Sequence, residues 1–513
     1  MIISEMQSKL ATWSTENVNR KFNRLLRLIA NKDWLHEAAK ITLASSGART
    51  PGIDGIDKKR MEMELENEIE NIRRELLTGS YVPRPVRRIF ILKDNGKQRP
   101  LGIPCIRDRI VQRAMLMAME PIWESDFHSN SYGFRTERSV HHAIRTVKLQ
   151  LQDGAEAMNS TAGRWVIEGD LASYFDTVHH RLLMKAIRKR IADRRFLRLV
   201  WIILKSGLVD KGLFRATHEG VPQGGVISPL LSNIMLHEFD MWMESNFLNK
   251  KVRKDRWAWN FGIQQGRPIA IRENRQWKPA VSYCRYADDF VIVVKGNKNH
   301  AKEVRERCRQ YLEDELKLTL NMDKTHITHV NDSFIFLGHR IIRKKGPAGK
   351  MRIVTNIPWD KHRRFTEKLV KQLSGNYSMS VPDMIENLNS QINGWANFYQ
   401  YTDYTATIYS KIDRTVFWKF GHWLARKFKT GFRELMPKYF RAHGDATAKT
   451  WVFKGKPSRF KRYKQCALKR LVSSRKGQFR WRNPADNPYK LAIKEHRFVE
   501  SYYDEVAFAL SNS

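Results

Sequence analysis

Two adjacent acidic residues, Asp288 and Asp289, stand between two apolar runs rich in Tyr, Val, Ile and Phe within residues 282–294. Such runs on both sides of a short polar break predict a β-hairpin whose tight turn carries both acids. Adjacent carboxylates at a turn repel one another, and a divalent cation bound by their oxygens relieves that repulsion. A solvated turn explains an isolated Asp pair equally well, because Asp favours turns through local hydrogen bonds. Residues elsewhere in the chain must decide between the two.

A third acid, Asp170, stands at the end of another expected strand. The apolar stretch 165–167 runs directly into Asp170, and a turn and then a helix follow. An acid that ends a buried strand is held rigidly, as a metal site requires. Asp176 and Glu168 are the alternatives within the same window.

A second expected hairpin has strands over residues 86–92 and 98–103 around the turn 94–96, and two basic residues flank that turn. Lys93 offers a point charge and Arg99 a planar fork, and together they suit a triphosphate. A solvated basic hairpin is the alternative, because exposed Lys and Arg are common.

A loop with Pro222, Gln223 and two adjacent glycines comes before an apolar helix that is expected to start at Ser228. The glycine pair lets the backbone approach a ligand closely, although a plain turn uses glycines equally well.

The 513-residue chain carries 92 Lys and Arg against 53 Asp and Glu, a net charge of +39. This excess favours a polyanionic partner, and nucleic acid is the leading one. An anionic membrane surface is the competitor, but no run of about 18 apolar residues suits a membrane span. The N-terminal residues lack a secretory pattern, and the cysteines have no paired spacing typical of zinc or disulfide frameworks, so we expect a cytoplasmic protein with reduced thiols. These four cysteines are Cys105, Cys284, Cys308 and Cys466.

The charge is most one-sided near the C-terminus, where residues 451–482 contain twelve Lys or Arg and no Asp or Glu. Such a segment repels itself unless a polyanion neutralises it. We therefore predict nucleic-acid binding by its basic side chains, led by Lys454, Lys456, Arg459, Lys461, Arg462, Lys464, Lys469 and Arg470.

Apolar periodicity predicts helices over residues 5–45, 58–77 and 107–123, and mainly helices beyond residue 358. Residues 243–281 show little periodicity and are expected to form a polar insertion. The adjacent pairs His141-His142 and His179-His180 lack the spacing of helical metal ligands, so we predict surface or capping roles for them.

Together these motifs form a recognisable set. Asp170, the Pro222-Gln223-Gly224 loop and the Tyr286-Ala287-Asp288-Asp289 hairpin, in that order, resemble the palm of a reverse transcriptase. Residues 50–57 and 133–139 upstream are similar to those of group II intron-encoded reverse transcriptase/maturases, and residues 391–399 resemble their maturase (thumb) domain. The resemblance covers roughly residues 20–420.

The resemblance implies an α/β (α+β palm) fold, a right-hand polymerase with fingers, palm and helical thumb, followed by a basic C-terminal DNA-binding region. We expect an N-terminal extension over residues 1–50, fingers and palm over 51–350, the thumb or maturase (X) domain over 351–425, and the basic region over 426–513. The family's activity is RNA-directed DNA synthesis from deoxynucleoside triphosphates (dNTPs). Expected partners are an RNA template, a DNA primer or target DNA, and intron RNA in a ribonucleoprotein.

The resemblance also implies roles for single residues. Two Mg²⁺ ions would be held by Asp170, Asp288, Asp289 and the backbone carbonyl of Leu171, as in two-metal catalysis. The expected nucleotide-binding residues are Lys93 and Arg99 for the triphosphate, Phe175 as the ring that excludes a ribose 2′-hydroxyl, Gln223 beside the templating base, and Lys324 near the active site.

One departure from the family is expected to matter. Many members end in a His-Asn-His endonuclease domain built on Cys-x-x-Cys pairs, and this chain has no such pairs. We therefore predict that it carries no DNA-cleaving domain. Two other functions stay open: an RNA-binding splicing cofactor with a dispensable polymerase site, and a domesticated relative used in phage defence, CRISPR spacer acquisition or repair. The residues do not distinguish a monomer from a dimer.

Overall fold

The computed structural model describes residues 3–92, 96, 98–152, 164–210, 213–216, 219–222, 224–249, 258–264, 267–273, 280–346, 349, 351–442, 449–453, 466–474, 477–481 and 486–490. The chain divides into two compact units. The first comprises Met1–Leu151, Ser160–His329 and Trp481–Ser513, and the second comprises Gln152–Asn159 and Val330–Arg480. The chain therefore leaves the first unit after His329 and returns to it at Trp481.

The first unit begins with helices. They are α1 (Ile3–Glu16), α2 (Leu25–Ile29), α3 (Lys32–Ala44), the 3-10 turn η1 (Ser46–Arg49), α4 (Lys58–Met63), α5 (Leu65–Thr78) and α6 (Ile106–Trp123). Two expected helices are thus broken. Residues 5–45 form three helices because Asn31 caps α3 by accepting hydrogen bonds from the backbone of Asp33 and Trp34, at 3.0 and 3.3 Å. The helix expected over 58–77 is interrupted at Glu64.

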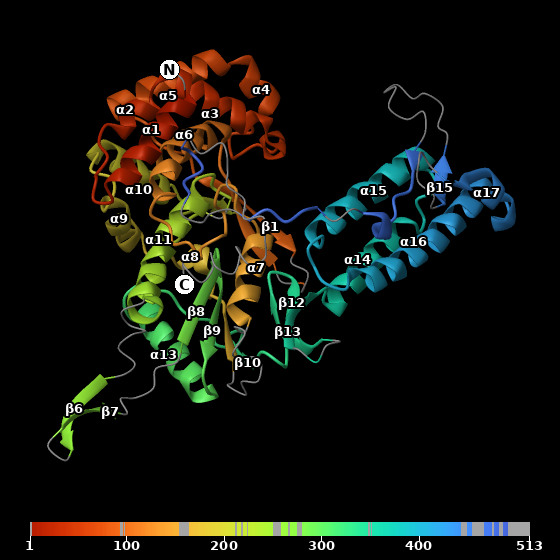
Figure 1. Ribbon diagram of the computed structural model, residues 1–513. Helices are drawn as coiled ribbons and strands as arrows, with labels where there is room; N and C mark the ends of the chain where they lie inside the picture. Colours follow the sequence, from red (N-terminus) through yellow and green to blue (C-terminus); the bar gives the residue numbers. More distant parts are fainter. Residues whose placement is uncertain are drawn as a thin grey trace. The chain divides into compact units, whose positions relative to one another are not determined.

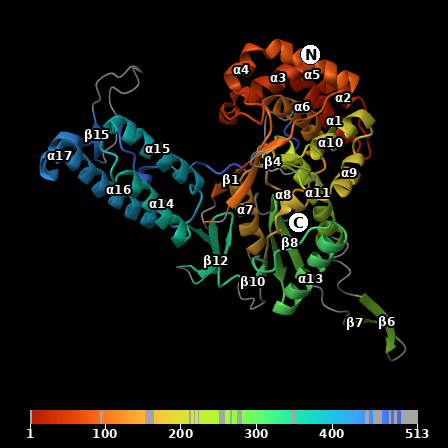
Figure 2. The same cartoon turned by 180° about the vertical axis from the view of Figure 1, so that it is seen from behind.

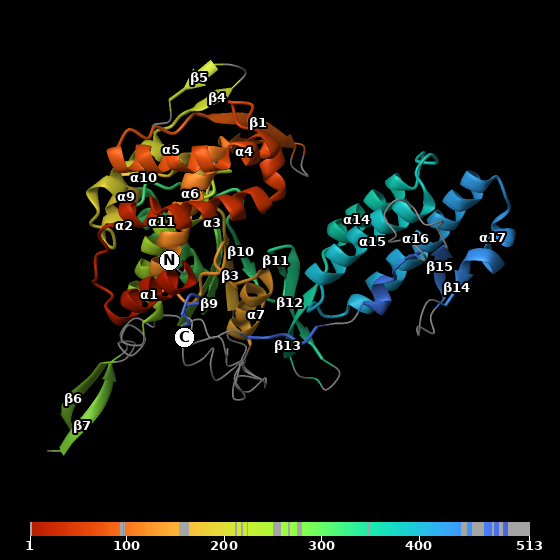
Figure 3. The ribbon, with the colours of Figure 1, turned by 90° about the horizontal axis from the view of Figure 1, so that it is seen from above.

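A four-stranded sheet lies beside these helices, in the order β2-β1-β4-β5 (Figure 3). Its strands are β1 (Val86–Leu92), β2 (Gln98–Ile103), β4 (Leu208–Asp210) and β5 (Leu213–Arg215). The expected hairpin is confirmed: β1 and β2 pair antiparallel, with Arg87 opposite Ile103 and Leu92 opposite Gln98.

A second sheet in this unit has the order β10-β3-β9-β8 and is antiparallel throughout. It contains β3 (Arg164–Gly169), β8 (Ala280–Tyr286), β9 (Asp289–Lys295) and β10 (His326–His329). Helix α7 (Val140–Leu151) contacts β8 and β9, and α13 (Lys298–Asp314) contacts β3 and β10 (Figures 1 and 2). The central strands are buried on both faces, as expected for a sheet covered by helices on its two sides.

The remaining elements of the first unit connect this sheet to the helical part. They are α8 (Tyr174–Thr177), α9 (His180–Arg188), α10 (Arg194–Leu204), α11 (Ser228–Met243), the π-helical turn η3 (Glu244–Leu248) and the hairpin β6 (Ala258–Gln264) with β7 (Arg267–Glu273). The expected helix start at Ser228 is confirmed, with Pro229 in the first turn. The stretch 243–281, expected to form a polar insertion with little periodicity, contains η3 and the β6–β7 hairpin. One core of buried side chains, including Trp34, Phe196 and Phe239, runs through the unit.

The second unit is mainly helical. Its helices are α14 (Trp359–Gln372), α15 (Val381–Phe398), α16 (Thr405–Phe428) and α17 (Phe432–Tyr439). One small sheet contains β11 (Phe334–Phe336), β12 (His339–Lys345) and β13 (Met351–Asn356), and the other contains β14 (Phe440–Arg441), β15 (Thr450–Phe453) and β16 (Cys466–Ala467), followed by the 3-10 turn η4 (Leu471–Ser473). The first sheet lies at one end of the helices, and α17 with β15 lies at the other (Figure 1). This unit has its own core, including Met384, Phe420 and Trp451.

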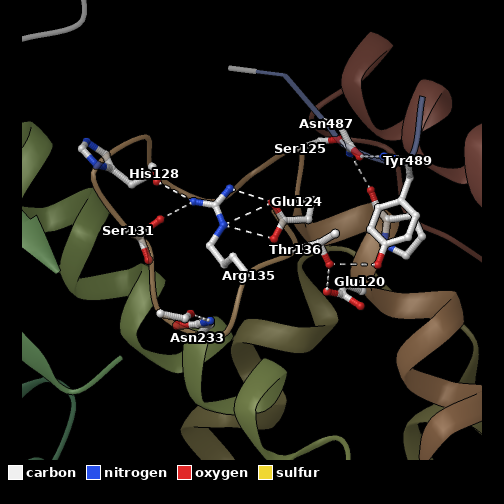
Figure 4. Close-up of polar contacts among 12 residues, drawn as sticks. Glu120, Glu124, Ser125, His128, Ser131, Arg135, Thr136, Asn233, Asn487 and Tyr489 are labelled. Atoms are coloured by element: carbon white, nitrogen blue, oxygen red, sulfur yellow. Dashed lines mark hydrogen bonds and ion pairs between the residues drawn. The ribbon is translucent and has the colours of Figure 1, made fainter. Parts of the chain in front are cut away.

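The described residues after the second unit bind to the first. The Asn487 side chain donates hydrogen bonds to the Pro121 carbonyl and the Ser125 hydroxyl at 2.9 and 2.7 Å, and the Tyr489 hydroxyl lies 3.3 Å from that of Thr136 (Figure 4). Asn487 is buried, so these bonds satisfy a side chain that burial would otherwise destabilise.

Two general expectations are also tested here. All four cysteines are free thiols, as predicted. Within the described part of the chain, none of the helices has the length and apolar composition needed to cross a lipid bilayer.

Candidate active site

The turn between β8 and β9 consists of two residues, Ala287 and Asp288, and Asp289 is the first residue of β9. The hairpin is therefore confirmed, but the turn itself carries one acid and the strand carries the other. Ala287 has φ 57°, a left-handed conformation that two-residue hairpin turns require and that usually falls to Gly or Asn. The conformation must therefore be held by the surroundings.

The backbone of Gly133 is one of these supports. A Cβ atom at position 133 would lie 2.2 Å from the Ala287 backbone nitrogen, so only glycine allows this approach. The adjoining residues bind β8 directly: the Tyr132 backbone donates to the Arg285 carbonyl, and the Arg285 backbone donates to the Asn130 carbonyl, both at 2.9 Å. The loop 130–135 therefore braces the turn from outside the sheet.

That loop is fixed by a buried ion pair between Arg135 and Glu124. The guanidinium Nη2 lies 2.8 Å from the carboxylate, and Nη1 donates to the carbonyls of His128 and Ser131 at 2.9 and 2.7 Å (Figure 4). Both side chains are 1 % exposed. A charge-assisted network of this kind gives the loop one geometry.

The second support for the turn is the side chain of Arg285. Its Nη1 donates to the Ala287 carbonyl at 2.9 Å and to Asn233 Oδ1 at 3.0 Å, while Nε and Nη2 bind the two Asp240 oxygens at 2.7 and 2.5 Å. Both charged side chains are 0 % exposed. Burial lowers the pKa of Arg285, but the charge and hydrogen bonds of Asp240 raise it above its ordinary value. Asn233 also donates to the Gly133 carbonyl at 2.8 Å, which links the two supports.

The third acid lies next to this hairpin. Gly169 of β3 is paired with Phe290 of β9, so the next residue, Asp170, is placed beside Asp289. Neighbouring positions on antiparallel strands bring Cβ atoms to about 5 Å, which is close enough for two carboxylates to share a cation. Asp170 Oδ2 accepts a hydrogen bond from Lys324 Nζ at 2.7 Å and one from Asn321 Nδ2 at 3.3 Å.

The electrostatics of this cluster favour an added positive charge. Partial burial, then the negative charges of Asp288 and Asp170, raise the pKa of Asp289 to about 6. The hydrogen bond to Asp170 raises the pKa of Lys324 above its ordinary value. In the described ranges, no three His, Cys, Asp or Glu side chains already stand in a metal-binding arrangement. Lys324 is hydrogen-bonded to Asp170, and carboxylates without a bound cation repel one another. A bound cation would therefore have to bring the three acids closer together.

The backbone of Leu171 adds one potential oxygen ligand. Leu171 and Leu320 form an isolated antiparallel bridge, and the flanking hydrogen bonds run from Ala172 N to Thr319 O and from Asn321 N to Asp170 O, both at 2.9 Å. The two leucines are therefore a non-hydrogen-bonded pair, whose carbonyls point away from the partner segment. Carboxylate and carbonyl oxygens are the donors that Mg²⁺ prefers, so this donor set fits the ion.

Phe175 lies on α8, where its ring meets Tyr174 edge-on, at a centroid distance of 5.5 Å. The Phe175 carbonyl accepts a hydrogen bond from the Val221 backbone at 2.7 Å, so the backbone at Phe175 is tied to the loop that precedes Gln223. His180 holds the same loop by donating to the Gly220 carbonyl at 2.6 Å. The expectation of a surface or capping role is wrong for His180, which is buried because its ring satisfies that carbonyl, whereas His179 does cap α9.

Of the other predicted nucleotide-binding residues, Lys93, Gln223 and the side chain of Arg99 lie outside the described part of the structure. The Arg99 backbone is paired with Ile91. A Cβ atom at Gly224 would lie 2.3 Å from the Gly102 carbonyl, so the glycine loop touches β2. A cavity of about 390 Å³ opens between this hairpin and the loop, with Arg88 and Pro222 in its lining.

In the basic C-terminal region, Lys454, Lys456, Arg459, Lys461, Arg462 and Lys464 lie outside the described residues. Lys469 and Arg470 are exposed on the second unit. Lys469 Nζ donates to Asn393 Oδ1 at 3.1 Å, which directs this lysine towards α15.

Several supporting residues were not foreseen. The turn is supported by Asp240 and Asn233, which bind Arg285 from 45 or more positions away in the sequence. It is also supported by Gly133, which acts through its backbone alone. No local sequence pattern marks any of these three residues. Arg285 carried a usable signal, because a charged residue inside an otherwise apolar strand needs a buried partner.

Comparisons with known proteins agree with this geometry. The family profile described as reverse transcriptase (RNA-dependent DNA polymerase) matches residues 91–341. The profile described as group II intron, maturase-specific domain, matches residues 362–440. Protein YkfC of Escherichia coli is 64 % identical over 373 residues, which cover 73 % of this chain and 97 % of YkfC. The chain belongs to the group II intron reverse transcriptase/maturase family.

Other relatives of this group II intron protein are more distant. The group II intron-encoded protein LtrA of Lactococcus lactis is 32 % identical over 379 residues, covering 66 % of this chain and 60 % of LtrA. A putative COX1/OXI3 intron 1 protein of Saccharomyces cerevisiae is 33 % identical over 350 residues, covering 64 % of this chain and 40 % of that protein. The chain is thus a mixed α/β protein with a reverse transcriptase domain and a helical maturase region. Its enzyme class is RNA-dependent DNA polymerase, a typically metal-dependent family, and its two domains imply template, primer and intron RNA as ligands.

Proposed function

We propose that the protein is the RNA-directed DNA polymerase of a group II intron, which copies RNA into cDNA and also binds its intron RNA to assist splicing and mobility. The observation that supports this most strongly is the juxtaposition of three carboxylates. Asp170 directly follows β3, Asp289 begins the neighbouring β9, and Asp288 lies on the turn between β8 and β9.

Asp170, Asp288, Asp289 and the Leu171 carbonyl are proposed to hold two Mg²⁺ ions. When bound, the ions would lower the pKa of the primer 3′-hydroxyl and stabilise the leaving pyrophosphate. The protein's part is to fix the acids. Arg285 and Gly133 set the turn that carries Asp288, and β3 sets Asp170 against Asp289. Lys324 pairs with Asp170, which places its positive charge beside the carboxylates that would hold the ions and where the triphosphate would bind.

The proposed nucleotide contacts extend from this centre. Lys93 and Arg99 on the β1–β2 hairpin grip the triphosphate, and Gln223 supports the templating base. Phe175 excludes a ribose 2′-hydroxyl by the bulk of its ring. The hydrogen bond from the Val221 backbone to the Phe175 carbonyl fixes the backbone that carries this ring. The substrates are therefore deoxynucleotides.

In terms of the right-hand architecture, we assign the palm to the sheet β10-β3-β9-β8 and the fingers to β1–β2 with the preceding helices. The thumb corresponds to α14–α16, and the basic region after residue 425 to a DNA-binding region. The four segments 1–50, 51–350, 351–425 and 426–513 stay a prediction, as does a cytoplasmic location.

Primer extension on an RNA template with Mg²⁺ and dNTPs tests the polymerase role, and intron splicing measured in parallel tests the maturase role. The variant Asp288→Ala/Asp289→Ala should lose cDNA synthesis and still assist splicing of the intron RNA. Asp314→Ala, which removes an exposed carboxylate at the end of α13, is the matched control and should keep both. Full cDNA synthesis by the double variant would disprove the assigned metal site, and equal loss of splicing in a folded variant would disprove the separation of roles.

A further inference from the structure

A cavity of about 280 Å³ lies within the second unit, between α16, the β14-β15-β16 sheet and the segment that follows β16. Its floor is aromatic. Phe417 and Trp451 are stacked with centroids 5.4 Å apart, and Phe440 lies 5.2 Å from Phe417. Phe417 and Phe440 are half-buried, so part of each ring still faces the cavity. The volume is slightly below the usual range of small-molecule sites and suits one nucleobase, not a duplex.

The rim of this cavity is cationic. Arg414, Lys449 and Arg470 line it, and all three are exposed. The one acidic side chain in the lining, Asp413, has its oxygens engaged: they accept hydrogen bonds from the Leu471 and Val472 backbone at 2.8 and 3.0 Å. The cavity therefore combines an apolar aromatic floor with a rim on which basic side chains outnumber the acidic Asp413.

The cavity is also preformed. Asp413 of α16 fixes the start of η4, and Asn389 of α15 fixes the residues just before it, by donating to the Ala467 carbonyl at 2.9 Å and accepting from the Lys469 backbone at 2.7 Å. The Trp451 indole donates to the Phe417 carbonyl at 3.1 Å. A site held in this way loses little conformational entropy when a ligand enters.

A ligand that matches both parts has a flat aromatic end and a phosphate, as a nucleotide does. Stacking on aromatic rings and phosphate contact by Lys or Arg are the two standard modes of binding single-stranded nucleic acid. Part of the cavity lining comes from residues 449–451 and 468–470. The sequence between these two segments contains six further basic residues, from Lys454 to Lys464 inclusive.

The observations favour RNA over DNA. The match to the maturase-specific domain covers residues 362–440 and so includes the α16 wall and Phe440. Ser410 and Thr450 add hydroxyl groups to the lining. The Thr450 hydroxyl donates to the Leu468 carbonyl at 2.5 Å and can still accept from a ribose 2′-hydroxyl, and the exposed Ser410 offers a second hydroxyl. Proteins that read RNA commonly take single bases out of loops and stack them on aromatic side chains.

We propose that this cavity captures one unstacked nucleotide of a single-stranded RNA segment, with its base on Phe417 and Phe440 and its phosphate between Arg414, Lys449 and Arg470. The proposal rests on the RNA-binding role given above. It adds to that role a base-binding pocket in the second unit, where the sequence alone predicted only contacts between basic side chains and nucleic acid.

The test fills the pocket without removing charge. Ser410 is an exposed lining residue, and Ser410→Trp places a large ring at the entrance. The full chain and this variant are titrated with a mixed-sequence single-stranded RNA of about 15 nucleotides, over a series of salt concentrations. The variant should bind at least about fivefold more weakly, the loss expected for one base–aromatic stack, with an unchanged salt dependence. Lys419→Ala, which removes an exposed charge on the same helix outside the lining, is the control and should not show the affinity loss of Ser410→Trp.

A second measurement does not depend on variant folding. The same RNA carrying 4-thiouridine is cross-linked to the wild-type chain, and the adducts are mapped by mass spectrometry. Adducts on Phe417, Phe440 or Trp451 support the pocket. The absence of these adducts overturns the pocket, and so does a Ser410→Trp variant that binds the RNA as tightly as wild type. Equal binding and cross-linking of DNA of the same sequence overturns the assignment to RNA. These readouts measure RNA binding and not DNA synthesis, so failure of the polymerase proposal is seen separately by primer extension.

Discussion

The buried pair Arg285–Asp240 offers the sharpest test of how the hairpin turn is held. Both side chains are 0 % exposed and joined at 2.5 Å. Arg285→Met leaves Asp240 buried without its cation, and Asp240→Leu leaves Arg285 buried without its anion. Each single change should cost about 3–5 kcal/mol, the usual penalty for breaking a buried ion pair.

The double variant Arg285→Met/Asp240→Leu removes both charges together. It still removes the hydrogen-bond partners of two groups. The Tyr283 hydroxyl donates to Asp240 at 2.8 Å, and the side-chain oxygen of Asn233 accepts from Arg285 at 3.0 Å. We expect a total cost of no more than about 3 kcal/mol, which is at least about 3 kcal/mol less than the sum of the two single changes. Calorimetric unfolding of all four proteins measures this coupling.

Activity should follow a different pattern. The Ala287 carbonyl loses its donor in every variant without Arg285, so the left-handed turn is no longer held and Asp288 is misplaced. The double variant should therefore regain stability without regaining RNA-templated primer extension, assayed at a temperature where all four proteins are folded. Recovery of both properties together would refute the positioning role of Arg285, and single-variant costs below about 1 kcal/mol would refute the buried pair itself.

Three variants at other residues of the first unit have expected outcomes of their own. Gly133→Ala places a Cβ atom 2.2 Å from the Ala287 nitrogen, so it should displace the turn and reduce primer extension at least about tenfold while circular dichroism stays unchanged, and full activity would contradict the close approach. Phe175→Ala should raise ribonucleotide incorporation relative to deoxynucleotide incorporation by about tenfold or more, measured by competing the two substrates, and an unchanged ratio would contradict the steric role. Burial lowers the pKa of His237 to about 4, so folding loses stability as the pH falls from about 6.5 to 4, by up to about 3 kcal/mol. His237→Gln should lose less over that range, and parallel unfolding curves would contradict the shift.

The elements that local patterns describe were predicted well from the sequence. The β1–β2 hairpin has the expected strands because apolar residues surround an Asp-Asn-Gly turn, and α11 starts at Ser228 because Ser-Pro favours a first helical turn. The break within residues 5–45 has a local cause, because Asn is a preferred N-cap residue and Asn31 caps α3. The apolar periodicity alone predicted one continuous helix there.

The contacts that assemble the site were less accessible. The sequence marked Asp170, Asp288 and Asp289, but strand pairing decides that Asp170 lies beside Asp289. Asp240 binds Arg285 across 45 positions, and Gly133 acts through the absence of a side chain, so neither has a local signature. The β14–β16 sheet was missed because its strands span only two to four residues, too few for an alternating pattern.

Three carboxylates are proposed to hold the catalytic ions, and RNA-templated primer extension by single variants measures what each of them contributes. Asp170→Asn, Asp288→Asn and Asp289→Asn each remove one negative oxygen donor while keeping size, and Asp314→Asn is the matched exposed control. Each of the three should reduce the rate at saturating Mg²⁺ and dNTPs by at least about a hundredfold, because a lost metal ligand removes several kcal/mol of transition-state stabilisation. The control should extend primers like wild type. Near-wild-type extension by any one of the three folded variants would contradict the account.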